Sequence, residues 1–135
     1  MFNYLERNKV VLVYLPLIFY WLLLFILTSL PSQSVPSVGV NDKLEHFAAF
    51  FGLSFLLYLA LSLQKKSPLV RKNAFLFTLI IASFYGLLDE LHQLIIPGRS
   101  CELIDLTADI LGAILGVVFF KIVFLKLFKR EELPA

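Results

Sequence analysis

The sequence has few charged residues and almost no cysteine. Charged residues make up 16% of its 135 residues, whereas a soluble domain has about a quarter. Its one cysteine, Cys101, excludes an intramolecular disulfide. Internal repeats and low-complexity tracts are also missing. Hydrophobic residues make up 59% of the chain and the mean hydropathy is +0.85, so the composition favours a membrane protein over a soluble domain.

Four apolar runs are long enough to cross a bilayer. A span needs about 20 mostly apolar residues, and only helices or closed barrels satisfy the backbone in lipid. The runs are continuous rather than alternating, which is typical of helices. We therefore predict an all-α fold, a four-transmembrane-helix bundle that forms a single membrane domain over residues 1–135. The predicted helices cover about residues 10–30, 44–63, 74–96 and 103–128.

The first run has a second interpretation, a cleaved signal peptide. Its charge-free stretch, Val10–Leu30, is longer than the usual apolar region of about 7–15 residues. No clear Ala-x-Ala cleavage site follows it. We therefore expect a retained helix that is kinked by Pro16 and ends near Pro31.

The basic residues are divided unequally between the predicted loops. Lys43 and Arg99 would lie on one side of the membrane. The other ten of the twelve are Arg7, Lys9, Lys65, Lys66, Arg71, Lys72, Lys121, Lys126, Lys129 and Arg130. Short loops rich in Lys and Arg stay in the cytoplasm. We therefore predict a multi-pass protein of the bacterial cytoplasmic membrane with both termini cytoplasmic and with loops Pro31–Lys43 and Pro97–Glu102 outside.

Acidic residues and histidines gather at the predicted outer ends of the helices. They are Asp42, Glu45, His46, Asp89, Glu90, His92, Glu102, Asp105 and Asp109. A helix rises 1.5 Å per residue, which places Glu90 and Asp109 roughly 10 Å along their helices. An acid that faced lipid there would cost about 2.5–3.5 kcal/mol. We therefore expect these side chains to point inward.

Helical spacing places several of these residues on common faces. Asp105, Asp109, Gly112 and Gly116 form one stripe of the last helix. Small residues at this spacing let another helix approach closely, so we predict that Gly112 and Gly116 are packing residues. We also predict an outward-open polar pocket among the second, third and fourth helices. Its predicted lining is Asp42, Lys43, His46, Glu90, Gln93, Arg99, Asp105 and Asp109.

Purely structural roles are the alternative for some of these residues. Asp42 precedes Glu45 by three residues, as in a capping box, and would then cap the second helix. Arg99 would pair with Asp105 or Glu90, because buried acids need partners. His46 would be a hydrogen-bonded core residue. Asp89, His92 and Glu102 would lie in the membrane interface.

Two stretches of the sequence resemble a known family. "DKLEHFAAFFGL" has the form Asp-Lys-x-x-His-Phe, and "DELHQLIIPGRSCELIDLTADILGAILG" combines Glu-x-x-Gln, Pro-x-Arg, Asp and Gly-x-x-x-Gly. Residues 42–116 are similar to the VanZ-like family of small bacterial integral membrane proteins. The resemblance implies a polytopic helical protein of the cell envelope, from a family associated with teicoplanin resistance. The residues that fill the family pattern are Asp42, Lys43, His46, Glu90, Gln93, Arg99, Asp105, Gly112 and Gly116, whereas Asp109 stands where the family often has Asn.

The favoured function is binding of an outer-leaflet molecule. The pocket would receive the head of a membrane lipid, a cell-wall precursor or a glycopeptide-type molecule. Lys43 and Arg99 would meet anionic groups. Acids outnumber cations, so a zwitterionic or amine-bearing ligand or a bridging cation fits better than a purely anionic one. We expect no nucleic-acid partner, and a homo-oligomer remains an option.

Three other functions stay open. A membrane-surface enzyme would use His46 and Glu90 as general base and acid, with Asp105 orienting the histidine. A metal-assisted variant would use His46, Glu90, Asp105 and Asp109. The sequence has no His-Glu-x-x-His or Gly-x-Ser-x-Gly motif, so we predict no cofactor and favour binding over catalysis. Ion-coupled transport and an assembly role through the small-residue stripe are the remaining hypotheses.

Overall fold

The computed structural model describes residues 2–34 and 41–129, and every regular element in these ranges is helical. The first membrane-spanning stretch comprises a π-helix, η1 (Val10–Tyr14), and α2 (Leu15–Ser29). The other long helices are α3 (Asp42–Ser62), α5 (Ala74–Gln93) and α6 (Leu103–Lys129). Short helices connect or flank them: α1 (Phe2–Arg7), the 3-10 helix η2 (Ser32–Ser34) and α4 (Pro68–Lys72).

The described residues are all helical where regular, which confirms the predicted all-α class, and four stretches are long and apolar enough to cross a membrane, as predicted. They are Val10–Ser29, Asp42–Ser62, Ala74–Gln93 and Leu103–Val123. Two predicted positions, residues 35–40 of the first outer loop and Arg130 at the C-terminal end, lie outside the described residues.

Two prolines shape the first span. Pro16 lies in the first turn of α2, directly after the π-helical turn η1. Because proline cannot donate a backbone hydrogen bond, a wider turn before it accommodates the missing bond. At the other end Leu30 has an extended conformation (φ −81°, ψ 139°), as the residue before a proline prefers. The span therefore ends one residue before Leu30.

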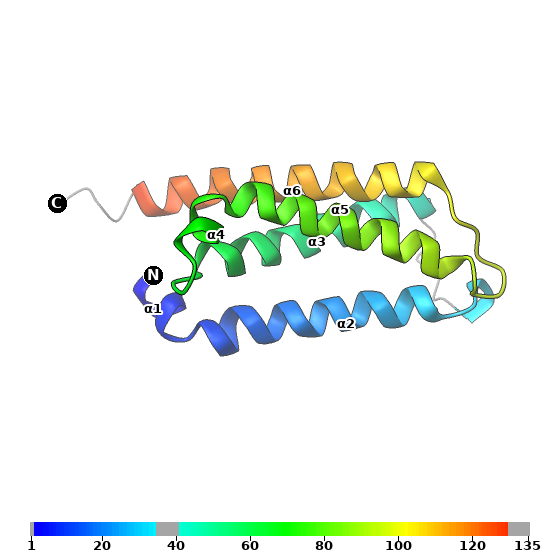
Figure 1. Cartoon of the computed structure of the whole chain (residues 1–135), viewed down its shortest axis with the longest axis horizontal. Coiled ribbons are helices and arrows are strands. Elements are labelled where there is room, and N and C mark those ends of the chain that lie inside the picture. Colours follow the sequence, from blue (N-terminus) through cyan, green and yellow to red (C-terminus); the bar gives the residue numbers. More distant parts are fainter. Residues whose placement is uncertain (1, 35–40, 130–135) are drawn as a thin grey trace.

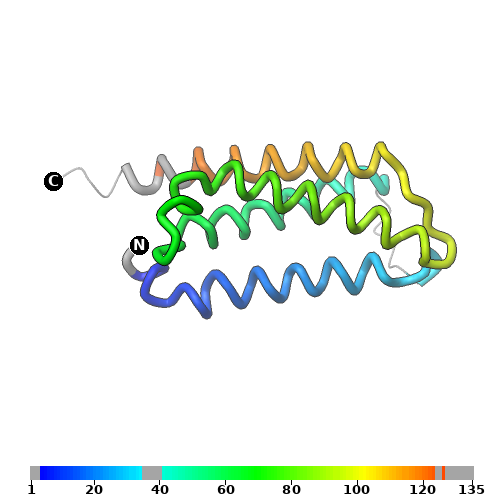
Figure 2. Tube along the Cα trace, in the orientation of Figure 1, coloured from blue at the N-terminus to red at the C-terminus, as the bar shows by residue number. Residues whose placement is uncertain are grey.

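The long helices run side by side along the long axis of the molecule (Figure 1). The N-terminal helix α1 and the C-terminal part of α6 lie at the same end of the bundle (Figure 1). Helices α3, α5 and α6 pack together, and α3 makes its most extensive contacts with α6. Helix α2 lies along one side of this group (Figure 2).

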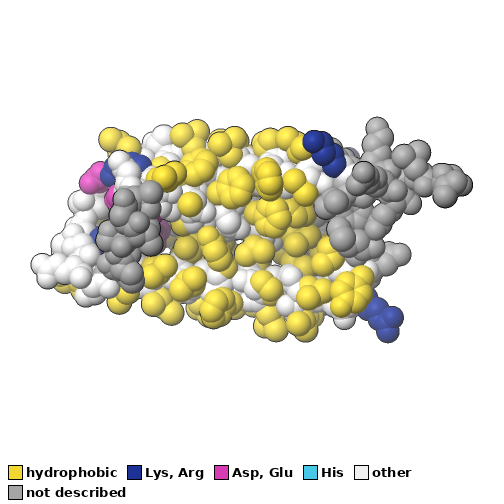
Figure 3. Space-filling model, turned by 180° about the vertical axis from the view of Figure 1, so that it is seen from behind, with side chains coloured by type: hydrophobic (Ala, Val, Ile, Leu, Met, Phe, Trp, Pro, Cys, Tyr) yellow, Lys and Arg dark blue, Asp and Glu magenta, His cyan; other side chains and the backbone are white. Residues whose placement is uncertain are grey.

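Apolar side chains cover the middle of the face shown in Figure 3. On α2, for example, Phe19 is 70% exposed, and Ile18, Leu22 and Phe25 are exposed as well. Charged side chains on this face lie towards the two ends of the bundle (Figure 3). An apolar belt of this kind matches the hydrocarbon layer of a bilayer, in which exposed apolar groups are stable.

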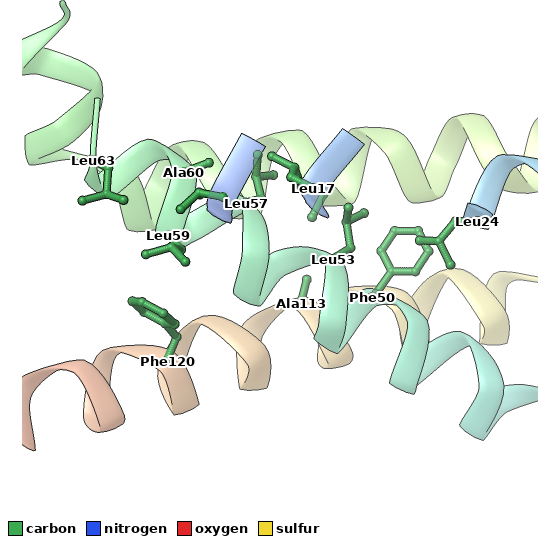
Figure 4. Packing of buried hydrophobic residues seen from close by; sticks show 12 residues of the cluster. Leu17, Leu24, Phe50, Leu53, Leu57, Leu59, Ala60, Leu63, Ala113 and Phe120 are labelled. Atoms are coloured by element: carbon green, nitrogen blue, oxygen red, sulfur yellow. The ribbon is translucent and has the colours of Figure 1, made fainter. Parts of the chain in front are cut away.

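The buried apolar core lies between α2, α3, α5 and α6. Leu17 and Leu24 of α2 face Phe50 and Leu53 of α3, and Ala113 of α6 lies nearby (Figure 4). This core fixes α2 against α3 and leaves the polar residues clustered near one end of the bundle.

Gly112 and Gly116 lie where α6 crosses α3 most closely. A Cβ atom at Gly112 would collide with the carbonyl oxygen of Phe47, and one at Gly116 with that of Phe51. Only glycine therefore allows this approach. The contact brings the first turns of α6 beside the first turns of α3, and this positions the polar cluster.

The orientation in the membrane is testable through Cys101, which is exposed in the loop between α5 and α6. The distribution of basic residues predicts that this loop lies outside. A membrane-impermeant maleimide is therefore expected to label Cys101 in intact cells. The control is a Ser67→Cys, Cys101→Ser variant, whose thiol lies in the predicted cytoplasmic loop and should react only after lysis. The reverse labelling pattern would overturn the predicted orientation.

Candidate functional site

The start of α3 is capped by Asn41. Its side-chain oxygen accepts a hydrogen bond from the backbone N–H of Lys43 at 2.9 Å. The capping role considered for Asp42 is therefore wrong. Asp42 instead lies in the first turn, with its carboxylate 3.6 Å from the Lys43 ammonium. Its charge is favourable there because it lies at the positive end of the helix dipole.

Lys43 joins α3 to the start of α6. Its Nζ lies 2.8 Å from Oδ1 of Asp105 and 2.7 Å from Oε2 of Glu102. The Asp105 side chain is only 3% exposed, whereas that of Lys43 is 34% exposed. The Lys43 ammonium also holds the pKa of Glu102 below its usual range, mainly through their hydrogen bond. Lys43 therefore neutralises a buried acid from the edge of the cluster.

Arg99 contacts the end of α2. Its Nε and Nη2 donate to the carbonyl oxygens of Leu30 and Leu27, each at 3.5 Å. The pairing with Asp105 or Glu90 considered from the sequence is not formed among the described side chains, because Asp105 pairs with Lys43. A cation at these last carbonyls complements the helix dipole, so Arg99 fastens the α5–α6 loop to α2.

His46 is held by two carboxylates from two other helices. Its Nδ1 lies 2.9 Å from Oδ1 of Asp109 and 3.9 Å from Oε1 of Glu90. The residue that orients the histidine is thus Asp109 of α6, and the orienting role considered for Asp105 is wrong. The other oxygen of Glu90, Oε2, accepts from the backbone N–H of Glu102 at 2.8 Å. Glu90 therefore also fixes the chain where it enters α6.

A cavity of about 360 Å³ opens beside this cluster. It lies between α2, α3 and α5, and Arg99 borders it. The side chains that line it are Leu24, Leu27, Thr28, Asp42, Glu45, His46, Ala49, Phe50, Tyr85, Asp89 and Arg99. The wall from α2 and the middle of α3 is apolar, and the charged side chains come from the first turns of α3, the last turns of α5 and the following loop.

The position of this cavity differs from the predicted pocket. Of the eight predicted lining residues, Asp42, His46 and Arg99 lie on its wall. The other five form the cluster behind or beside it and are Lys43, Glu90, Gln93, Asp105 and Asp109. The prediction placed the pocket among the second, third and fourth helices, but the first span contributes one of its walls. This span carries almost no polar residues, and so it gave no signal of a pocket.

Asp89 and Tyr85 belong to the site although the sequence did not single them out for it. Asp89 is only 4% exposed, lines the cavity and accepts a hydrogen bond from Nε2 of Gln93 at 3.1 Å. Asp89 is therefore part of the buried polar site. Its four-residue separation from Gln93 was the available signal, because it places both side chains on one helix face.

His92 links α5 to α2 outside the cavity. Its Nε2 lies 3.1 Å from Oγ of Ser29, and its ring stacks on Phe25 with the ring centroids 5.4 Å apart. This contact and that of Arg99 both involve the last turns of α2. The end of α2 that borders the cavity is thus held by two separate contacts.

Together these features define a helical membrane protein with four spans and a buried polar centre near one end. The chain matches the profile of the family described as VanZ/LLP1 over residues 11–125. It belongs to this family, as the two motif stretches predicted.

One curated relative is an uncharacterized protein of Schizosaccharomyces pombe. It is 30% identical over 112 residues, which cover 83% of this chain and 62% of the relative. The chain thus spans less than two thirds of that protein's length. Because the relative is fungal and uncharacterized, it indicates neither a bacterial source nor an activity. No solved structure matches the chain.

Proposed function

We propose that this protein binds the polar head of a membrane amphiphile in the cavity between α2, α3 and α5. The observation that carries the proposal is the composition of the cavity wall, which joins an apolar side to a charged end within a transmembrane bundle. Leu24, Leu27 and Phe50 offer apolar surface, and Asp89 and Arg99 offer opposite charges. Ligand sites commonly combine a mostly apolar wall with a few placed polar groups.

The charges on the wall favour a head that carries an amine. Three carboxylates, those of Asp42, Glu45 and Asp89, line the cavity together with the single guanidinium of Arg99 and the imidazole of His46. A purely anionic head would meet net repulsion from the carboxylates. A zwitterionic head would place its amine by the acids and its phosphate by Arg99, whose planar donors suit phosphate.

Several molecules of the outer leaflet present this chemistry. An amine-bearing lipid, a lipid-linked cell-wall precursor and a lipoglycopeptide each join an apolar part to a head with an amine or a zwitterion. In this proposal the protein lies in the bacterial cytoplasmic membrane with the cavity facing outward, in the orientation that Cys101 labelling tests. Membrane lipids are then its immediate partners.

Thermal unfolding in detergent tests the proposed ligand class. Phosphatidylethanolamine is expected to raise the midpoint by several degrees, because a ligand that binds only the folded state stabilises it. Phosphatidylglycerol with the same acyl chains should have much less effect. Asp89→Asn should remove this difference, whereas Glu6→Gln, an acid-to-amide change at the opposite end of the bundle, should keep it. Equal responses to both lipids in all variants would contradict the proposal.

A second candidate function is catalysis on a lipid-linked substrate. Nδ1–H of His46, on the cavity wall, donates a hydrogen bond to the buried carboxylate of Asp109 at 2.9 Å, and a carboxylate-oriented imidazole is suited to general-base work. The two functions are distinguished by incubating the protein with the lipids of the unfolding experiment and analysing these lipids by mass spectrometry. Recovery of each unchanged supports binding, and a product that forms with the wild type but not with His46→Gln supports catalysis.

A further inference from the structure

Three potential metal ligands from three helices converge behind the cavity. They are His46 of α3, Glu90 of α5 and Asp109 of α6, and one ligand atom from each lies within 4.8 Å of the other two. Nδ1 of His46 is 2.9 Å from Asp109 Oδ1 and 3.9 Å from Glu90 Oε1. These side chains are at most 9% exposed. The cluster is thus part of the interior rather than a group of surface acids.

Two oxygens in this cluster have no hydrogen-bond partner among the described residues. They are Oε1 of Glu90 and Oδ2 of Asp109, both buried. A buried acceptor that lacks a partner carries the full penalty of its lost hydration, and native structures contain few of them. Each oxygen belongs to a residue of the converging set, so both residues keep an unused acceptor for an added group.

The buried acids of the interior also outnumber the cations beside them. Asp89, Glu90, Asp105 and Asp109 are each at most 4% exposed. Among the described residues, the cations within ion-pair distance of these four acids are Lys43, which pairs with Asp105, and His46. Glu90 and Asp109 therefore share at most the single charge of His46. Buried charges are stable when they are paired or coordinate a metal.

We propose that His46, Glu90 and Asp109 bind a divalent transition-metal ion. The proposal departs from the sequence-based expectation of no cofactor. It takes up the metal-assisted alternative considered there, without Asp105. One imidazole and two carboxylates suit zinc better than calcium or magnesium, which prefer oxygen ligands throughout. Zinc bonds of about 2.1 Å in a tetrahedron place ligand atoms roughly 3.4 Å apart. The observed separations of 2.9 Å and 3.9 Å bracket that value.

A neighbouring set of ligands is less suited to a metal. Asp42, His46 and Asp105 also lie within 4.8 Å of one another. However, the Asp42 side chain is 51% exposed, and Asp105 already pairs with Lys43 at 2.8 Å. A metal there would compete with this ion pair, whereas among the described residues the one basic side chain within ion-pair distance of Glu90 and Asp109 is His46 itself. Since His46 also lies on the cavity wall, a metal on the preferred set would be next to the proposed amphiphile site.

Metal analysis of the purified chain tests this proposal without any lipid. The protein, carrying no histidine tag, is stripped with a chelator, incubated with Zn²⁺, desalted and measured by plasma mass spectrometry. About one zinc per chain is expected for the wild type. Glu90→Gln and Asp109→Asn keep the side-chain shape and should each weaken binding at least about tenfold, since even residues behind the ligands contribute about 10–100-fold. Asp89→Asn, the neighbouring buried acid, should retain one zinc.

Cobalt provides a second readout. It would not change if Glu90 and Asp109 had only a structural role. Co²⁺ bound by the wild type should give visible absorption bands that Zn²⁺ removes, and Glu90→Gln should lack them while still eluting as folded protein. Absence of stoichiometric zinc in the wild type would overturn the proposal. Equal zinc binding by the wild type and by the Glu90→Gln, Asp109→Asn double variant would overturn it as well. Both outcomes leave the lipid-binding experiment unaffected, so the two proposals can fail separately.

Discussion

Gly112→Leu is expected to prevent stable packing of α6 on α3. A Cβ atom at this position would collide with the carbonyl oxygen of Phe47 and would also lie 3.1 Å from its Cα. These are backbone atoms, so no change of side-chain rotamer relieves the collision. Overpacking typically costs about 1–3 kcal/mol, and a leucine against the backbone should reach or exceed the upper end. Gly112→Ala should already be destabilising.

Unfolding in detergent, followed by circular dichroism and gel filtration, measures this effect. The matched control is Leu111→Phe, because Leu111 is 50% exposed on the same helix and added bulk there can extend outward from the bundle. Its stability should stay within about 0.5 kcal/mol of the wild type. A Gly112→Leu variant as stable as this control would mean that α6 does not approach α3 at Gly112.

The packing of α6 on α3 is the part of the fold that the sequence specified best. Four apolar runs of sufficient length predicted the spans, and the small residues at positions 112 and 116 marked the face of α6 that approaches another helix. The positions of the acidic residues along these runs predicted which ends of the helices are polar. Such periodic patterns lie within one helix, so they can be recognised in the sequence without knowing which helix packs against it.

The pairings within the polar cluster could not be predicted in the same way. Asp105 and Asp109 lie one turn apart on one face of α6, and either could meet His46 if α6 slid by about 5.4 Å along α3. The sequence specifies the face but not this axial position. The close contact of Gly112 with Phe47 sets it. As a result, Asp109 meets His46, and Asp105 meets Lys43 one turn away.

The contribution of α2 to the cavity was also beyond the sequence pattern. Helix α2 is apolar on all sides, so no face of it is marked as facing the protein. Besides the core, the loop after α5 holds the end of α2, and in this loop Gly98 has a φ of +74°. Glycine adopts this conformation readily, and the resulting turn precedes Arg99, which reaches the carbonyls of Leu27 and Leu30. The contact joins two segments that are far apart in the sequence, and neither segment has a residue pattern that predicts it.

Lys43→Ala is expected to destabilise the bundle, and a second change, Asp105→Asn, should restore most of the loss. Without the ammonium 2.8 Å away, the buried Asp105 carboxylate has no cation beside it, and a buried group left without its partner costs about 1–3 kcal/mol. The neutral amide in the double variant removes the uncompensated charge. Asp105→Asn alone should cost less, because Lys43 is partly exposed and still has Glu102 at 2.7 Å.

A double-mutant cycle from unfolding midpoints in detergent measures the coupling between the two residues. Lys65→Ala serves as the matched control, because Lys65 also contacts an acid, Glu6, at 2.9 Å but is 59% exposed. Exposed ion pairs contribute little, so this variant should unfold near the wild-type midpoint. If both lysine variants lose the same stability, or if Asp105→Asn fails to rescue Lys43→Ala, then Lys43 does not neutralise Asp105. The acids at this end of the bundle would then require another source of positive charge, and the three-helix cluster around His46 would be the place to look for it.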